Sequence, residues 1–178
     1  MAEIQTVRLH LRAPRAADAA RIAEMLGEFE VAGNLARVPH PYAIEDAEAW
    51  LEAMPLNPPP RETAFMIATH DGDLIGNVGF HERWAGIADI GYYIGKPFWG
   101  NGFATEAAKA ALGWYFDASG ADRVRSGVFH FNEASLAVQR KLGFVTIGTS
   151  DIHCLARGET VMHIDTELTR EAFRAAIQ

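Results

Sequence analysis

Trp99-Gly-Asn-Gly-Phe-Ala-Thr-Glu-Ala107 is a glycine-rich corner that runs directly into an alanine-rich segment. The apolar, aromatic run Ile90-Gly-Tyr-Tyr-Ile94 stands just before it. This order predicts a strand, a turn and a helix. Gly100 and Gly102 allow a positive φ or a close approach of the backbone to a ligand. The first N–H groups and the dipole of the helix favour an anion, such as a phosphate, although a plain turn explains the same glycines.

The corner differs from the two common nucleotide-binding loops. It lacks a third glycine at the dinucleotide-binding spacing, and it lacks the Gly-Lys-Ser/Thr ending of a nucleotide-triphosphate loop. The nature of the anion therefore has to be inferred from other parts of the chain.

A second strand and helix follow the corner. Residues 124–131 predict a strand and residues 133–142 a short helix, with Asn132 as its N-cap and Gly143 as its left-handed C′ residue. Two consecutive units of strand and helix place a parallel pair of strands side by side, with a ligand crevice at their ends. We therefore expect the chemistry to gather at these strand ends.

The remaining segments predict a meander of strands with helices around it. Together they indicate a mixed α+β domain over residues 1–178, with a sheet of about seven mostly antiparallel strands. The further predicted strands are 6–11, 63–69, 74–80, 88–95, 144–147 and 160–168, and the further predicted helices are 16–31, 44–54, 103–118 and a short one from about 169.

Composition excludes several classes of protein. The single Cys154 rules out an internal disulfide framework and fits a reducing, cytoplasmic compartment, and no segment has the ~20 apolar residues of a membrane span. The net charge of -7 argues against a nucleic-acid partner. It is compatible with a cationic substrate, although acidity also serves solubility.

Three segments resemble the GNAT superfamily of N-acetyltransferases, and within it the RimJ/RimL branch that acetylates protein N-termini. Residues 6–12 resemble the opening strand of that branch. Residues 89–94 and 99–107 resemble the strand and acetyl-CoA pyrophosphate loop, and Asn132 to Phe144 resemble the second cofactor motif. The chain departs from the wider superfamily at Pro97, where Gln or Arg is common.

The resemblance implies a single GNAT domain whose central parallel strands splay apart. It also implies direct transfer of an acetyl group from acetyl-CoA to a primary amine by a monomer or homodimer, with no metal and no covalent acyl-enzyme. The resemblance further implies that a backbone N–H of a bulged strand, near Tyr93 and Ile94, donates a hydrogen bond to the carbonyl oxygen of the thioester. The residues implied in cofactor binding are Tyr93, Ile94, Trp99, Gly100, Asn101, Gly102, Phe103, Ala104, Thr105, Asn132 and Lys141.

The reaction needs one residue that takes a proton and one that donates a proton, and the chain has candidates for each. Asp89 and Glu82 are the alternatives for the group that takes a proton from the amine, although either is also an ordinary strand carboxylate at the surface. Ser135 matches the Asn-x-x-Ser pattern of the family and is the candidate proton donor to the departing thiolate. A serine there equally serves as a hydrogen-bonding residue at a helix terminus.

The sequence leaves three hypotheses for the function. A proline-bent loop over residues 37–42, with Trp50, is either the acceptor groove or ordinary surface packing. No histidines stand at metal-ligand spacing, and His81 and His130 are kept as acceptor-site candidates. The acceptor is the α-amine of a polypeptide or a small amine, and the third hypothesis is a CoA-binding module without turnover.

Overall fold

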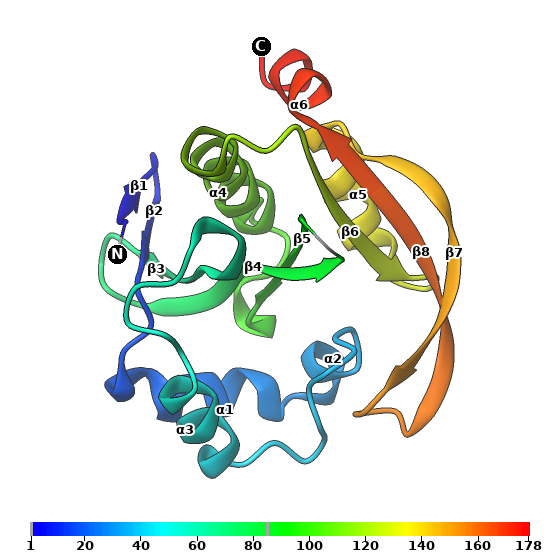
Figure 1. Ribbon diagram of the computed structural model, residues 1–178. Coiled ribbons are helices and arrows are strands. Elements are labelled where there is room, and N and C mark those ends of the chain that lie inside the picture. Colours follow the sequence, from blue (N-terminus) through cyan, green and yellow to red (C-terminus); the bar gives the residue numbers. More distant parts are fainter. Residues whose placement is uncertain (1, 85) are drawn as a thin grey trace.

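The computed structural model describes residues 2–84 and 86–178, which form an eight-stranded sheet with helices on both sides (Figure 1). The strands are β1 (Ile4–Gln5), β2 (Leu9–Arg12), β3 (Ala64–Thr69), β4 (Leu74–Trp84), β5 (Ile87–Ile94), β6 (Arg123–Phe129), β7 (Val145–Cys154) and β8 (Glu159–Thr169). The helices are α1 (Ala19–Gly27), α2 (Phe29–Ala32), α3 (Ile44–Glu52), α4 (Phe103–Ser119), α5 (Glu133–Leu142) and α6 (Arg170–Ala176), with short 3-10 turns η1 (Ala16–Asp18), η2 (Pro60–Glu62) and η3 (Lys96–Phe98).

The sheet is mixed, as the sequence predicts. Its strand order is β1-β2-β3-β4-β5-β6-β8-β7, and β5 and β6 are the parallel pair among otherwise antiparallel described neighbours. The predicted fold class is confirmed, with eight strands in place of about seven. The additional strand is the short β1, which pairs with β2.

The first predicted strand is interrupted by a turn. The Thr6 hydroxyl donates to Glu106 Oε1 of α4 at 2.6 Å, and the Arg8 N–H donates to the same oxygen at 2.9 Å. These contacts with a helix distant in sequence draw the backbone out of the ladder, so β2 begins only at Leu9. Val7 lies in this turn and is 91% exposed, although the alternation of Val7, Leu9 and Leu11 in the sequence predicts one buried face for the three.

Two other predicted elements have different lengths. The predicted helix over residues 16–31 is divided into η1, α1 and α2, because Glu28 is extended at φ -72° and ψ 118°. Strand β7 continues well past the predicted end at Ile147 and pairs with β8 as far as Cys154. Most of its side chains are exposed, which removed the apolar alternation by which a strand is recognised.

The sheet separates two apolar clusters, and the alternation of β3 shows how. Phe65 and Ile67 pack with the buried face of α4, whereas Met66 between them packs with α1 and α3. Successive side chains of a strand point to opposite faces, so one short strand contributes to both clusters. Figure 1 shows α4 and α5 on one side of the sheet and α1 and α3 on the other.

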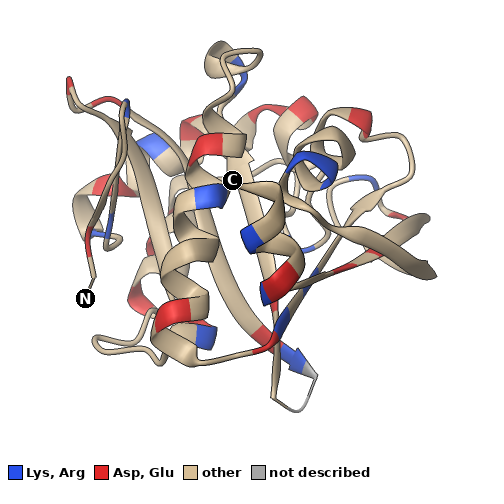
Figure 2. Cartoon of the chain, turned by 90° about the horizontal axis from the view of Figure 1, so that it is seen from above, with Lys and Arg blue, Asp and Glu red and all other residues tan. Residues whose placement is uncertain are grey.

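Charged residues are interspersed over the helices and strands (Figure 2). Within the described part of the chain, no helix combines the length and apolar character that a membrane crossing requires.

The parallel strands β5 and β6 meet at one point and then separate. Their backbone register is a single pair, Asp89 opposite Arg125. The Ser126 hydroxyl donates to the Ile90 carbonyl at 2.8 Å, immediately beyond that pair. The gap that opens past this fork is the splay implied by the family resemblance.

Two glycines give opposite expectations for stability. Gly143 ends α5 at φ +94°, and a Cβ there would lie 3.0 Å from the Ala172 carbonyl oxygen. Gly143→Ala is therefore expected to lower the free energy of unfolding by about 1–2 kcal/mol. Gly113 lies within α4 with open space at its Cβ position, so Gly113→Ala is expected to raise it by about 0.5–1 kcal/mol. Urea unfolding measures both, and shifts of the same sign would contradict the assigned conformations.

Candidate active site

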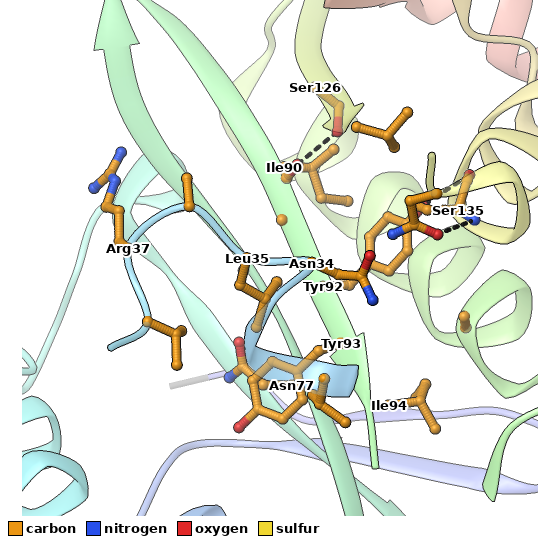
Figure 3. Close-up of a pocket in the computed structure, with 18 of the residues that line it drawn as sticks. Asn34, Leu35, Arg37, Asn77, Ile90, Tyr92, Tyr93, Ile94, Ser126 and Ser135 are labelled. Carbon is orange, nitrogen blue, oxygen red and sulfur yellow. Dashed lines mark hydrogen bonds between the residues drawn. The ribbon is translucent and has the colours of Figure 1, made fainter. Parts of the chain in front are cut away.

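A groove of about 1240 Å³ runs through the fork between β5 and β6. At one end lies the glycine corner before α4. At the other lies the loop after α2, whose residues Asn34, Leu35 and Arg37 are labelled in Figure 3. Of the residues predicted in cofactor binding, those that line the groove are Tyr93, Ile94, Trp99, Gly100, Gly102, Phe103, Ala104, Thr105, Asn132 and Lys141. The chain thus brings the two sequence motifs into one continuous cavity.

The glycine corner has the geometry that the sequence predicts. Gly100 and Gly102 both have φ +77°, a conformation that glycine adopts without strain. The first α-helical bond of α4 runs from the Glu106 N–H to the Gly102 carbonyl at 3.1 Å. The N–H groups of the three residues between them have no acceptor within the helix, and together with the helix dipole they suit an anion.

Arg8 fixes this corner from the N-terminal strand. Its guanidinium donates to the Asn101 carbonyl at 2.9 Å, pairs with Glu106 at 2.7 Å and lies 4.6 Å from the ring centre of Phe103. In the sequence Arg8 alternates with the apolar residues Val7 and Leu9, which predicts only a place on the outer face of a strand. The ionic partner is almost a hundred residues away, so no local pattern indicates the contact.

The open edge of β5 presents backbone donors to the gap. The Gly95 N–H donates to Ile75 of β4 at 2.8 Å, whereas the Ile90 carbonyl accepts a bond from β6. Because backbone groups alternate between the two edges of a strand, the N–H groups of Tyr92 and Ile94 face β6 and that of Tyr93 faces β4. The Ile94 carbonyl already accepts from Trp99 Nε1 at 2.6 Å.

The expected bulge near Tyr93 and Ile94 does not occur in the described pairing of β4 with β5. That pairing is regular from Ile94 opposite Gly76 to Ala88 opposite Glu82, and the register shifts only beyond Glu82. The departure of β6, rather than a bulge, leaves the backbone edge of β5 free.

Ser135 lies on the wall of the groove and contacts a buried tyrosine. The Tyr92 hydroxyl is 3.0 Å from Ser135 Oγ and 3.3 Å from the Ser135 carbonyl oxygen. Burial raises the pKa of Tyr92 to about 12, against a smaller opposing effect of its hydrogen bonds, so the phenol keeps its proton at neutral pH. Sequence reasoning treated Tyr92 as part of an apolar strand and missed this pair.

Asn132 is the N-cap of α5, as predicted. Its Oδ1 accepts from the Ser135 N–H at 3.1 Å, which orients the first turn that carries Ser135. Asn132 also lines the groove, so the cap and a contact with a ligand are compatible. That contact stays a prediction.

A buried hydrogen-bond chain holds the fork together. Gln139 of α5, only 1% exposed, donates to Ser126 Oγ at 3.0 Å and accepts from the Thr166 hydroxyl of β8 at 2.7 Å. Ser126 in turn donates to the Ile90 carbonyl, a bond drawn in Figure 3. This hydrogen-bond chain links α5, β8, β6 and β5, and no local sequence pattern indicates it.

The structure does not bring the two candidate carboxylates together. Asp89 lines the groove, with Arg83 at 3.6 Å and His81 at 4.0 Å. Glu82 is not among the described residues that line the groove, because neighbouring side chains of β4 face opposite sides of the sheet. It pairs instead with Arg61 at 2.9 Å.

The loop after α2 forms the other end of the groove. Residues 37–39, Tyr42 and Trp50 line it, and Figure 3 shows Arg37 of this loop. Its role as an acceptor site, rather than ordinary surface packing, stays a prediction. His81 also lines the groove, and burial together with the charge of Arg37 lowers the pKa of His81, so its imidazole tends to be neutral. His130 is not among the described lining residues.

Side chains that could bind a metal ion are not grouped together in the described part of the chain. Over residues 2–84 and 86–178, no three His, Cys, Asp or Glu side chains are grouped so that they could hold a metal ion. Cys154 is buried away from solvent.

Comparison with known proteins shows a family for most of the chain. Residues 8–145 match the family described as acetyltransferase (GNAT) domain. YoaA of Bacillus subtilis (strain 168), described as an uncharacterized N-acetyltransferase, is 40% identical over 74 residues, which are 40% of this chain and 42% of YoaA. The chain thus spans less than half the length of that curated relative.

Two solved structures share the whole fold. RimJ of Mycobacterium smegmatis in complex with CoA-disulfide has a TM-score of 0.82 at 20% identity, covering 99% of this chain and 92% of RimJ. Spermidine N-acetyltransferase from Vibrio cholerae in complex with CoA and spermine has a TM-score of 0.81 at 19% identity, covering 95% and 99%. At these identities the likeness is one of fold.

Proposed function

Because the chain belongs to the acetyltransferase (GNAT) domain family, we propose that it transfers an acetyl group from acetyl-CoA to a primary amine. The observation that carries the proposal is the open edge of β5, whose free N–H groups continue into the glycine corner along one groove. When bound, acetyl-CoA supplies the acetyl thioester. The residues of the chain bind it, orient it and move protons.

The glycine corner is the proposed site for the pyrophosphate. The N–H groups of residues 103–105 and the dipole of α4 attract the anion, while Arg8 and Glu106 keep the loop in place. The Ile94 N–H, with that of Tyr92, is directed into the gap and suits the thioester carbonyl oxygen, on which negative charge develops. Asn132 and Lys141 line the opposite wall.

Ser135 is the proposed proton donor to the departing sulfur. Its hydroxyl lies in the groove, and Tyr92 at 3.0 Å is a protonated partner that can orient it and restore its proton. A nucleophilic role for Cys154 is not part of the proposal, since this thiol is buried.

The acceptor amine enters from the end of the groove formed by the loop after α2. We propose the α-amine of a polypeptide, which agrees with the RimJ neighbour. A small polyamine is the second candidate, because Asp46, Glu62 and Asp89 place carboxylates along the groove and one structural neighbour is named for spermidine. In both cases Asp89 is suited to attract the ammonium group.

A thiol-release assay tests the proposed activity. Acetyl-CoA is incubated with alanyl-alanyl-alanine amide, spermidine or free alanine, and released CoA is measured with a thiol reagent. We expect release above background with the peptide amide first and spermidine second. CoA binding without release for any amine would leave only the interpretation of a binding module and would contradict the proposal.

The glycine corner is tested by Gly102→Val. A β-branched side chain at φ +77° forces the backbone to shift, so calorimetric binding of CoA is expected to be lost while the circular dichroism spectrum is retained. Gly158→Val is the matched control, since Gly158 has φ +65° in a turn outside the groove. Equal CoA affinity of Gly102→Val and the native protein would contradict the assignment.

Ser135→Ala tests the proposed proton donor. It is expected to lower kcat by about 10²-fold while changing CoA affinity little. Tyr92→Phe is expected to lower kcat less, because Ser135 retains its own hydroxyl. Ser119→Ala, outside the groove, is the control. An unchanged kcat in Ser135→Ala would remove this serine from the mechanism.

A further inference from the structure

A second polar chain lies on β7 and β8, apart from the residues discussed so far. His163 Nδ1 is 2.7 Å from Asp165 Oδ1, and the same oxygen accepts from the Ser150 hydroxyl at 2.9 Å. A carboxylate at this distance fixes the orientation of an imidazole and favours the tautomer with its proton on Nδ1. The other nitrogen, Nε2, is then left with a free lone pair.

The imidazole leans across β6 toward the fork. A Cβ built on Gly127 would lie 2.1 Å from His163 Cε1, so the ring occupies the space of the missing side chain. The strands β5 and β6 meet at Asp89 and Arg125, and Gly127 lies two residues past this point on β6. Gly91 lies two residues past the same point on β5, and a Cβ built on Gly91 would meet open space. His163 therefore faces the part of the gap where the two strands have just separated.

Nε2 of His163 is not buried, and the residue belongs to the groove lining. His163 lines the groove and is 14% exposed. No buried side-chain nitrogen or oxygen in the described part of the chain is without a partner, and the hydrogen bond found for this ring is the one at Nδ1. A nitrogen that has no such bond and is not buried is available to a substrate or water.

Several titratable and charged groups share the groove with His163. Asp165 is in contact with it, and Phe129 packs against its ring at 5.8 Å. The other titratable and charged lining residues are Arg37, Tyr42, Asp46, Glu62, His81, Arg83, Asp89, Tyr92, Tyr93, Lys141 and His153.

We propose that His163, held by Asp165, is the group that takes the proton from the acceptor ammonium. The inference rests on the proposed acetyl transfer. Nε2 of His163 takes one proton from the ammonium nitrogen of the acceptor. The lone pair of that acceptor nitrogen then forms a bond to the carbonyl carbon of the acetyl group as the C–S bond of the thioester breaks. Sulfur takes a proton from Ser135, the nitrogen loses its second proton through solvent, and Ser135 regains one. The balance is an amide, a thiol and one proton passed from His163 to water.

Asp89 is less suited to this step. Its carboxylate already faces Arg83 and His81, and those cationic or polar partners compete with an incoming proton. It attracts the ammonium by charge, whereas His163 has a directed and unshared lone pair.

Kinetic pH profiles separate the two residues. With alanyl-alanyl-alanine amide or spermidine, whichever the native protein acetylates, His163→Gln is expected to lower kcat/KM by about 10²-fold at pH 7. With the peptide amide the deficit narrows toward pH 9, because an α-amine with a pKa near 8 is then largely free and needs no acceptor; with spermidine it narrows only toward about pH 11, because alkylamines such as that of lysine have a pKa near 10. His10→Gln, at the far edge of the sheet, is the matched control.

Other variants make the outcome decisive. Added imidazole is expected to restore part of the rate of His163→Gly, and Asp165→Asn is expected to lower the rate less than His163→Gln. A deficit of His163→Gln that is equal at every pH, with no imidazole rescue, would overturn the proposal. So would a loss of pH dependence in Asp89→Asn alone. Absence of turnover in the native protein would instead contradict the acetyl transfer itself.

Nuclear magnetic resonance gives a readout that does not depend on activity. In long-range proton–nitrogen spectra of the native protein, the neutral imidazole of His163 is expected to carry its proton on Nδ1 and a bare Nε2. Asp165→Asn is expected to weaken that preference, and calorimetry is expected to give unchanged CoA affinity for His163→Gln. A proton on Nε2 in the neutral native protein would contradict the proposed role.

Discussion

The bond from Ser126 Oγ to the Ile90 carbonyl determines where β5 and β6 stop behaving as a sheet. Before it the two strands are in register at Asp89 and Arg125, and after it they separate. Gln139, fully buried and bonded to both Ser126 and Thr166, keeps the geometry of that point. A buried polar group without its partners costs about 1–3 kcal/mol, so the chain persists only as a complete set.

The fork gives each wall of the groove a separate task. The β5 wall offers backbone N–H groups and leads to the glycine corner, which Arg8 and Glu106 hold. The opposite wall carries Ser135 on α5 and His163 on β8. In the proposed reaction one wall holds the donor, and side chains of the other move protons. The apolar clusters on either face of the sheet support both walls.

The sequence correctly predicts those elements whose structure depends on neighbouring residues. The bounds of α5, its Asn132 cap and the left-handed Gly143 agree with prediction, because caps depend on neighbouring backbone groups. The turn at residues 6–8 and the pair of Tyr92 with Ser135 depend on contacts across the fold, which no local pattern records. Asp89 and Glu82 are equal alternatives in the sequence, but strand alternation places only Asp89 in the groove.

Amide hydrogen exchange, followed with and without CoA, tests the central claim most directly. If the fork presents the free edge of β5 to the donor, CoA slows exchange at the amides of Tyr92, Ile94 and residues 103–105, while the Tyr93 amide, bonded toward β4, changes little. Slowed exchange confined to other parts of the chain, with those amides unaffected, would contradict the account.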